Sequence, residues 1–253
     1  MNVRALWIVV IVVLLAAAGI FVFRSLSGEE PAAIGTAAPP ATSAPSEPPA
    51  TSVPPSSVGA DFVDPRPQTP TTVVNVVGVT ASGDPAPGFT VTEDSGDVEI
   101  TGCFASRASV SPGVVSCGST AAGADVCWTT PNRATLLCGT TPWEKSLRRM
   151  KTSEKVGIIA AEAEPLPWGL ELATGARCRL RNGGSWPGRA DDYVGYYDCG
   201  SESFYVVGKQ DDGPVQRSGP VWTALVGGLS GDNAEFPPPT KIRIVTAYFA
   251  ARA

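Results

Sequence analysis

The 253-residue sequence contains no histidine, and no cysteine precedes Cys103. Without histidine, a Ser-His or Cys-His nucleophile pair and a histidine general base are excluded. Zinc is disfavoured as well, because the six cysteines form no Cys-x-x-Cys pair and the closest two, Cys117 and Cys127, are ten residues apart. There is no Gly-x-Ser-x-Gly or Ser-x-x-Lys motif, no phosphate-binding loop and no dinucleotide fingerprint. The sequence therefore predicts no cofactor and no metal site, and it specifies no particular reaction.

The N-terminus carries one long apolar run. Residues 5–23 contain no charged side chain, and a helix of that length spans about 28 Å, close to the roughly 30 Å core of a bilayer. We interpret the run as an uncleaved signal anchor, with residues 1–4 as a cytoplasmic tip and the rest of the chain extracytoplasmic, so that the protein resides in the cell membrane as a single-pass protein. A signal peptide cleaved after Ala18 is the alternative, but it would leave a strongly apolar new N-terminus.

Residues 24–72 have a different composition. They hold 11 of the 24 prolines and are otherwise rich in Ala, Ser and Thr, with few large apolar side chains. Such a segment cannot bury enough apolar surface to offset the entropy lost on ordering. We therefore expect a disordered linker that tethers the C-terminal part of the chain, or, as an alternative, an O-glycosylated stalk.

Residues 73–253 are numerous enough for one extracytoplasmic domain with a hydrophobic core. They carry 16 basic and 19 acidic residues, a balance that argues against nucleic acid as a partner. Short runs rich in β-branched and aromatic residues recur between Gly, Pro, Asn and Asp, among them TVVNVVGVT, KVGIIAAEA and KIRIVTAYFA. This pattern predicts a mostly β domain, either a sandwich or a barrel-like sheet.

One segment, TTPWEKSLRRMK, predicts a short helix over residues 142–150. Thr141 occupies the N-cap position, Pro142 the first helical position, and Glu144 follows the cap by three residues. The apolar residues that would share the face packed on the sheet are Trp143, Leu147 and Met150.

The six cysteines all lie between residues 103 and 199, and an even number in an exported chain indicates disulfides. Two stretches resemble each other: TGC…VVSCGS and TGARC…YYDCGS both lead from a Thr-Gly turn to a cysteine and end in Cys-Gly-Ser. If each is a hairpin closed on itself, the pairs are Cys103–Cys117 and Cys178–Cys199, which leaves Cys127–Cys138. This is one of fifteen possible pairings, and each loop would contribute about 3 kcal/mol of stability in the chain-entropy model.

The overall plan and three local stretches carry a resemblance to a known group. The stretches are ADVCW, the following LLC with TPWEKSLRR, and EPLPWGLELATGARC. Together with one N-terminal apolar span and a Pro/Ala/Ser/Thr tether, they are similar to uncharacterised exported, membrane-anchored cell-envelope proteins of actinobacteria, of the mycobacterial type. The resemblance implies an envelope location and a β-rich fold, and it carries no catalytic residues.

The stretch CRLRNGGSWPGRADDYVGYYDC, from Cys178 to Cys199, is the best candidate for a binding site. Aromatic rings can stack on sugars or peptide groups, and arginine can clamp carboxylates. The candidate residues are Trp186, Tyr193, Tyr197, Arg181 and Arg189. In the alternative interpretation, Trp186 folds back as a lid, the tyrosines complete the core, and the stretch is only a stapled hairpin.

These observations favour a binding module over an enzyme. The expected ligand is a wall polymer or another envelope protein, and the membrane is contacted through the N-terminal helix. A hydrolase of wall metabolism that uses two carboxylates is the alternative, with candidates Asp191, Asp192, Asp198, Glu162 and Glu164. A purely structural subunit of an envelope complex is the third possibility.

Overall fold

The computed structural model of the protein describes residues 68–93, 100–118, 124–181, 183, 188–201, 204–230 and 235–253. Across these ranges the backbone forms fourteen β-strands and no helix. None of them contains a helix long and apolar enough to cross a membrane. The predicted anchor at 5–23, its tip at 1–4 and the linker up to residue 67 lie outside the described residues. The first strand begins at Thr72, one residue before the predicted start of the domain.

Six antiparallel strands close into a barrel. Each pairs with the next, in the order β14-β8-β9-β10-β11-β13, and β13 pairs again with β14. The strands are β8 (Gly169–Leu172), β9 (Arg177–Leu180), β10 (Val194–Ser201), β11 (Phe204–Gly208), β13 (Thr223–Gly227) and β14 (Thr240–Ala251). A short strand, β12 (Val215–Gln216), pairs with β13 as well. The barrel form of the predicted β domain is thereby confirmed.

The long strand β14 lines the barrel core on both sides of a bulge. Its pairing with β8 shifts register between Ile244 and Thr246, so the two-residue alternation changes phase there. As a result Ile244 before the shift and both Ala247 and Phe249 after it pack into the same buried cluster.

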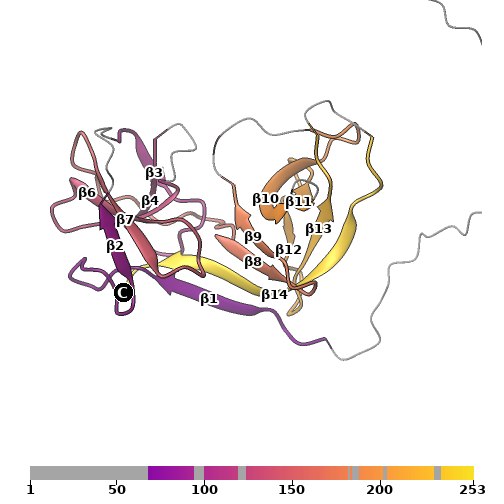
Figure 1. Ribbon diagram of the computed structural model, residues 1–253, viewed down its shortest axis with the longest axis horizontal. Helices are drawn as coiled ribbons and strands as arrows, with labels where there is room; N and C mark the ends of the chain where they lie inside the picture. The colour runs from indigo at the N-terminus through magenta and orange to yellow at the C-terminus, as the bar shows by residue number, and fades with distance from the viewer. Residues whose placement is uncertain are drawn as a thin grey trace, which may run out of the picture. The chain divides into compact units, whose positions relative to one another are not determined.

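From Thr246 onward, β14 pairs in parallel with β1 (Thr72–Val77) along the edge that pairs with β13 earlier in the strand. Figure 1 shows the two strands running side by side, β14 in yellow and β1 in purple. Thr71 lies at the point where β1 takes over from β13 as the neighbour of β14. Its hydroxyl accepts a hydrogen bond from the Trp222 backbone N–H and donates one to the Ile244 carbonyl, both 2.8 Å long.

A second, six-stranded sheet has the order β2-β7-β6-β5-β4-β3. Its strands are β2 (Thr90–Glu93), β3 (Cys103–Ala105), β4 (Val114–Cys117), β5 (Val126–Thr129), β6 (Thr135–Gly139) and β7 (Ser146–Lys151). The backbone N–H of Ala250, at the end of β14, donates to the Ala108 carbonyl, and the Ala250 carbonyl accepts from Val110. Trp128 of β5 packs in the same buried cluster as Ala250. The same long strand therefore contacts both sheets.

Two tryptophans form the centre of this second core. Trp128 on β5 is fully buried, and its indole N–H donates a 2.7 Å hydrogen bond to the carbonyl of Ala251 at the end of β14. Its ring meets that of Trp168 edge to face, with 6.0 Å between centroids. Gly139 is needed beside them, because a Cβ at that position would lie 2.6 Å from the Trp168 ring.

The three predicted disulfides are confirmed: Cys103–Cys117, Cys127–Cys138 and Cys178–Cys199. The first two join residues that lie directly opposite each other in antiparallel pairs, and the third joins β9 to β10. Short hairpins bring such cysteines together locally, which explains why a sequence pattern could identify them.

The predicted helix at 142–150 is wrong, because residues 146–151 form strand β7. The capping signal is present: the Thr141 hydroxyl accepts a 3.3 Å hydrogen bond from the Glu144 N–H. It produces only a turn, since β7 is an interior strand that pairs with β6 on one side and β2 on the other. Hydrogen bonding along both edges outweighs a local helical preference.

The strand predicted from KVGIIAAEA is also absent, and residues 155–163 form an irregular connection. Its backbone groups make isolated hydrogen bonds to other segments and no strand ladder. The Val156 N–H donates to the Arg133 carbonyl, and the Ile159 carbonyl accepts from the Gly113 N–H. Ile158 is 85% exposed, so the run of apolar residues that suggested a strand does not mark a buried one.

Replacement of Trp128 by Phe tests the link between β5 and β14. We expect Trp128→Phe to lower the free energy of unfolding by about 2–4 kcal/mol, because the buried Ala251 carbonyl loses its donor and a void remains beside Trp168. Chemical denaturation followed by circular dichroism measures the change. The half-buried Trp143 is the control, and Trp143→Phe should cost less than about 1 kcal/mol. Equal losses in the two variants would contradict the assignment.

Candidate functional site

The predicted binding stretch is a hairpin of β9 and β10 closed by Cys178–Cys199. Trp186, its central aromatic residue, lies outside the described residues, as do its neighbours 184, 185 and 187. The other four candidates are described, and they fall in separate environments.

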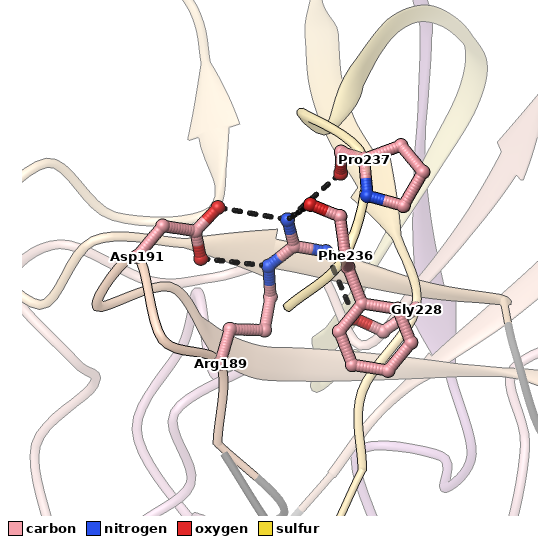
Figure 2. Close-up of polar contacts among 5 residues, drawn as sticks. All are labelled: Arg189, Asp191, Gly228, Phe236 and Pro237. Atoms are coloured by element: carbon pink, nitrogen blue, oxygen red, sulfur yellow. Dashed lines mark hydrogen bonds and ion pairs between the residues drawn. The ribbon is translucent and has the colours of Figure 1, made fainter. Parts of the chain in front are cut away.

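Arg189 is enclosed in protein. Its guanidinium makes a two-pronged ion pair with Asp191, with both N–O distances at 2.8 Å. The remaining contacts are to backbone carbonyls, at 3.0 Å to Gly228, 2.8 Å to Pro237 and 3.5 Å to Phe236 (Figure 2). Its side chain is fully buried, and all three nitrogens are engaged. Arg189 therefore joins the segment before β10 to the connection between β13 and β14. Its guanidinium is not available to clamp a carboxylate of a ligand.

The ion pair also sets the charge state of Asp191. The hydrogen bonds from Arg189 hold the pKa of the Asp191 carboxyl below its ordinary value of 3.8, and the same contact raises the pKa of Arg189. Asp191 is thus ionised and committed to this contact.

Tyr197 belongs to the barrel core. Its side chain is fully buried, and its hydroxyl donates a 2.9 Å hydrogen bond to the Pro167 carbonyl. Burial raises the pKa of the Tyr197 hydroxyl well above its usual value. This side chain fixes the connection that precedes β8 to the barrel wall.

Tyr193 and Arg181 are half-buried and lie at different cavities. Tyr193 borders a cavity of about 220 Å³ together with Lys209 and Lys241, and its ring centroid is 5.5 Å from the Lys209 ammonium nitrogen. Arg181 borders a cleft of only about 20 Å³ beside Ser106. Tyr193 also lies close to Arg189, with 5.9 Å between the Arg189 guanidinium carbon and the centre of the Tyr193 ring.

A groove of about 400 Å³ lies beside this stretch and includes Tyr196 of β10 in its lining. Its aromatic residue is Tyr196, the neighbour of the buried Tyr197. The Arg107 guanidinium carbon is 5.9 Å from the centre of the Tyr196 ring. The groove's acidic residues are Glu162, Glu164, Asp211 and Asp212.

Four separate segments position these groups, and Arg107 comes from the first of them, the loop between β3 and β4. Tyr196 comes from β10, Glu162 and Glu164 come from the irregular connection before β8, and Asp211 and Asp212 come from the turn after β11.

Arg217 anchors the acidic connection, since its guanidinium donates a 2.8 Å hydrogen bond to the Pro165 carbonyl. The same guanidinium lies 5.1 Å from the centre of the Trp222 ring, and burial lowers the pKa of Arg217. The hydrogen bond from Arg217 thereby fixes the backbone at Pro165, the residue that follows Glu164.

The groove is suited to hydrogen bonding and stacking. Its carboxylates accept hydrogen bonds from hydroxyl or amino groups, and Tyr196 offers a ring edge or face. Gln210 adds an amide at the rim. Across the described residues, no group of three or more Cys, Asp or Glu side chains is arranged to hold a metal ion.

The sequence pattern identifies this site only in part. It predicts Glu162 and Glu164 as candidate carboxylates, but Tyr196 is not among the predicted binding residues. It misses Arg107, Gln210 and the pair Asp211–Asp212, although the sequence QDDG marks an acidic turn.

The other candidate carboxylates lie away from the groove. Asp191 is held by Arg189, and Asp198 accepts a 2.8 Å hydrogen bond from the Gly200 N–H within its own turn. Asp192 lies in the turn before β10 with a positive φ of 65°. None of the three borders the groove at Tyr196.

Comparison with known proteins finds no match to a family model, a curated protein or a solved structure.

The Arg189–Asp191 pair makes stability depend on pH. Because the pKa of Asp191 is lowered on folding, its contribution is complete above pH 3.8 and is lost as the pH falls through the folded-state pKa. Asp191 is 42% exposed, so we discount the pair for solvent screening and expect Asp191→Asn to cost about 1 kcal/mol at pH 7. Urea denaturation at pH 7, 4 and 2.5 should show the parent and variant converging at the lowest pH. A constant difference would contradict the assignment.

Proposed function

We propose that the protein is a membrane-tethered, extracytoplasmic binding module of a bacterial cell envelope. In this proposal residues 5–23 anchor the chain with its N-terminus in the cytoplasm, and residues 24–72 tether the β domain outside the membrane. The ligand is a wall polymer or the surface of another envelope protein. The resemblance to actinobacterial envelope proteins supports the same location.

The disulfide-bonded state of the cysteines supports the proposed location outside the cytoplasm. All six cysteines are in disulfides, and disulfides persist mainly in oxidising environments outside the cytoplasm. Three disulfides in a domain whose described residues contain no helix suit a protein that must remain folded outside the cell.

The groove at Tyr196 is the observation that carries the binding function. It combines one aromatic ring with several carboxylates and an amide in an open cavity of about 400 Å³, within the size range of small-ligand sites. With four acidic residues and Arg107, the groove has an excess of negative charge, which favours hydroxyl-rich or amine-bearing ligands over anionic ones. Among the proposed ligands this composition favours a wall polymer.

Binding to wall material tests the proposal directly. Purified full chain in detergent, with its disulfides intact, is sedimented with isolated cell wall beside a Tyr196→Ala variant. We expect the variant to pellet with about fivefold lower affinity, the loss typical of one aromatic contact. Tyr205 is half-buried on β11 and outside the groove, so Tyr205→Ala is the matched control. If neither parent nor variants pellet, the ligand is not a wall polymer.

A carboxylate-dependent hydrolase is the second candidate. It is favoured by one observation, that Glu162 and Glu164 line the same groove as Asp211 and Asp212, since glycoside hydrolysis needs two carboxylates about 5–10 Å apart.

Release of soluble fragments separates the two candidates. We expect the full chain to bind wall material without releasing soluble sugar or peptide, measured by reducing-end and amino-group assays. Release that disappears in both Glu162→Gln and Glu164→Gln, while sedimentation persists, would establish the hydrolase instead.

A further inference from the structure

A second cavity, of about 270 Å³, lies at the tip of the β5–β6 hairpin. The turn of that hairpin forms one wall, the segment at Gly157 and Ile158 a second, and Arg252 just after β14 a third. It shares no lining residue with the groove at Tyr196. The two sites can therefore be tested independently.

Arg252 is held in place with part of its guanidinium free. One terminal nitrogen donates to the Thr129 carbonyl at 2.8 Å and to the Thr129 hydroxyl at 3.2 Å. The backbone N–H of Arg252 donates to the Ser111 hydroxyl at 2.7 Å. The other side-chain nitrogens of Arg252 have no hydrogen-bond partner in the part of the chain that the structure describes.

Arg133 occupies a backbone position that arginine seldom takes. Its φ is +56°, in the left-handed region that favours glycine or asparagine. The turn is rigid, because the Arg133 N–H donates to the Thr130 carbonyl at 2.9 Å and the hairpin is stapled by Cys127–Cys138. The Arg133 side chain is exposed and has no partner among the described residues. A strained position that keeps an unpaired arginine suggests a use for that side chain.

The cavity's charge differs from that of the rest of the protein. The chain has a net charge of −5, yet no Asp or Glu is among the described residues that line this cavity, which include two arginines. The lining also includes three apolar side chains, those of Pro112, Pro131 and the 85% exposed Ile158. An anion that carries a small apolar group matches both features.

We propose that this cavity binds a carboxylate borne by a small apolar residue, as at the C-terminal end of a peptide. A guanidinium fork matches the two oxygens of a carboxylate in one plane. Arg252 supplies a guanidinium held by Thr129 and Arg133 an exposed one, while Ile158 and the prolines contact the side chain next to the carboxylate. The volume lies just under the roughly 300 Å³ at which small-ligand pockets begin, so the cavity accepts the end of a chain.

Calorimetric titration of the full chain in detergent tests the proposal, in buffer free of phosphate and carboxylate. The probes are acetyl-Ala-Ala with a free carboxylate, the same peptide as its C-terminal amide, and inorganic phosphate. We expect the acid to bind at least about tenfold more tightly than the amide, as the loss of a charge-assisted contact predicts. Equal binding of acid and amide, binding of phosphate alone, or no binding of any probe would overturn the proposal.

Substitution at Arg133 localises the site without harming the fold. Arg133→Gly removes the guanidinium and suits the left-handed backbone, so its melting temperature should equal or exceed that of the parent while affinity for the acid falls about tenfold or more. Asp192 also has a positive φ, +65°, and does not line the cavity. Asp192→Gly is therefore the matched control and should bind like the parent. Undiminished binding by a folded Arg133→Gly would place the carboxylate elsewhere.

Discussion

The fold depends on hydrogen bonding along both edges of one strand. β14 pairs with β8 on one edge and, in succession, with β13 and β1 on the other. Each backbone amide and carbonyl in the interior needs a partner, and the twelve residues of β14 find theirs on three strands of one sheet. The first part of β14 closes the barrel by pairing with β13, and its last residues contact the second sheet, where Trp128 donates to the Ala251 carbonyl.

Several arginine side chains donate hydrogen bonds to backbone carbonyls outside the paired strands, as backbone N–H groups do within the sheets. Arg189 bonds to the carbonyls of Gly228, Phe236 and Pro237, Arg217 to Pro165, and Arg252 to Thr129. In a domain whose described residues contain no helix, long irregular connections have carbonyls that no strand satisfies. A guanidinium has several donors in one plane and can serve several of them at once.

The surroundings of each arginine distinguish those that hold the fold together from those that a ligand could contact. Arg189 is enclosed and fully engaged, whereas Arg107 beside Tyr196 and Arg133 at the hairpin tip border open cavities. The proposed binding groove and the proposed carboxylate pocket both border the irregular segment from 157 to 166. That segment connects the two sheets and contributes residues to both proposed sites. Placement of such sites on a loop that rigid elements hold is common in binding proteins.

The sequence by itself determined the β class, because strand periodicity is a local property that the order of residues specifies. Its repeated pattern from a Thr-Gly turn to Cys-Gly-Ser favoured the disulfide pairing that the structure then showed. Tertiary structure alone decided that residues 146–151 are a strand, since β2 and β6 supply pairing on both sides that no local pattern reveals. It also decided that Tyr197 is buried against the Pro167 carbonyl while Tyr196 lines a groove, because the segment before β8 supplies both contacts and lies far from β10 in the chain. The groove itself joins residues near 107, 162 and 211, and contacts between segments so far apart in the chain arise only when the sheets close.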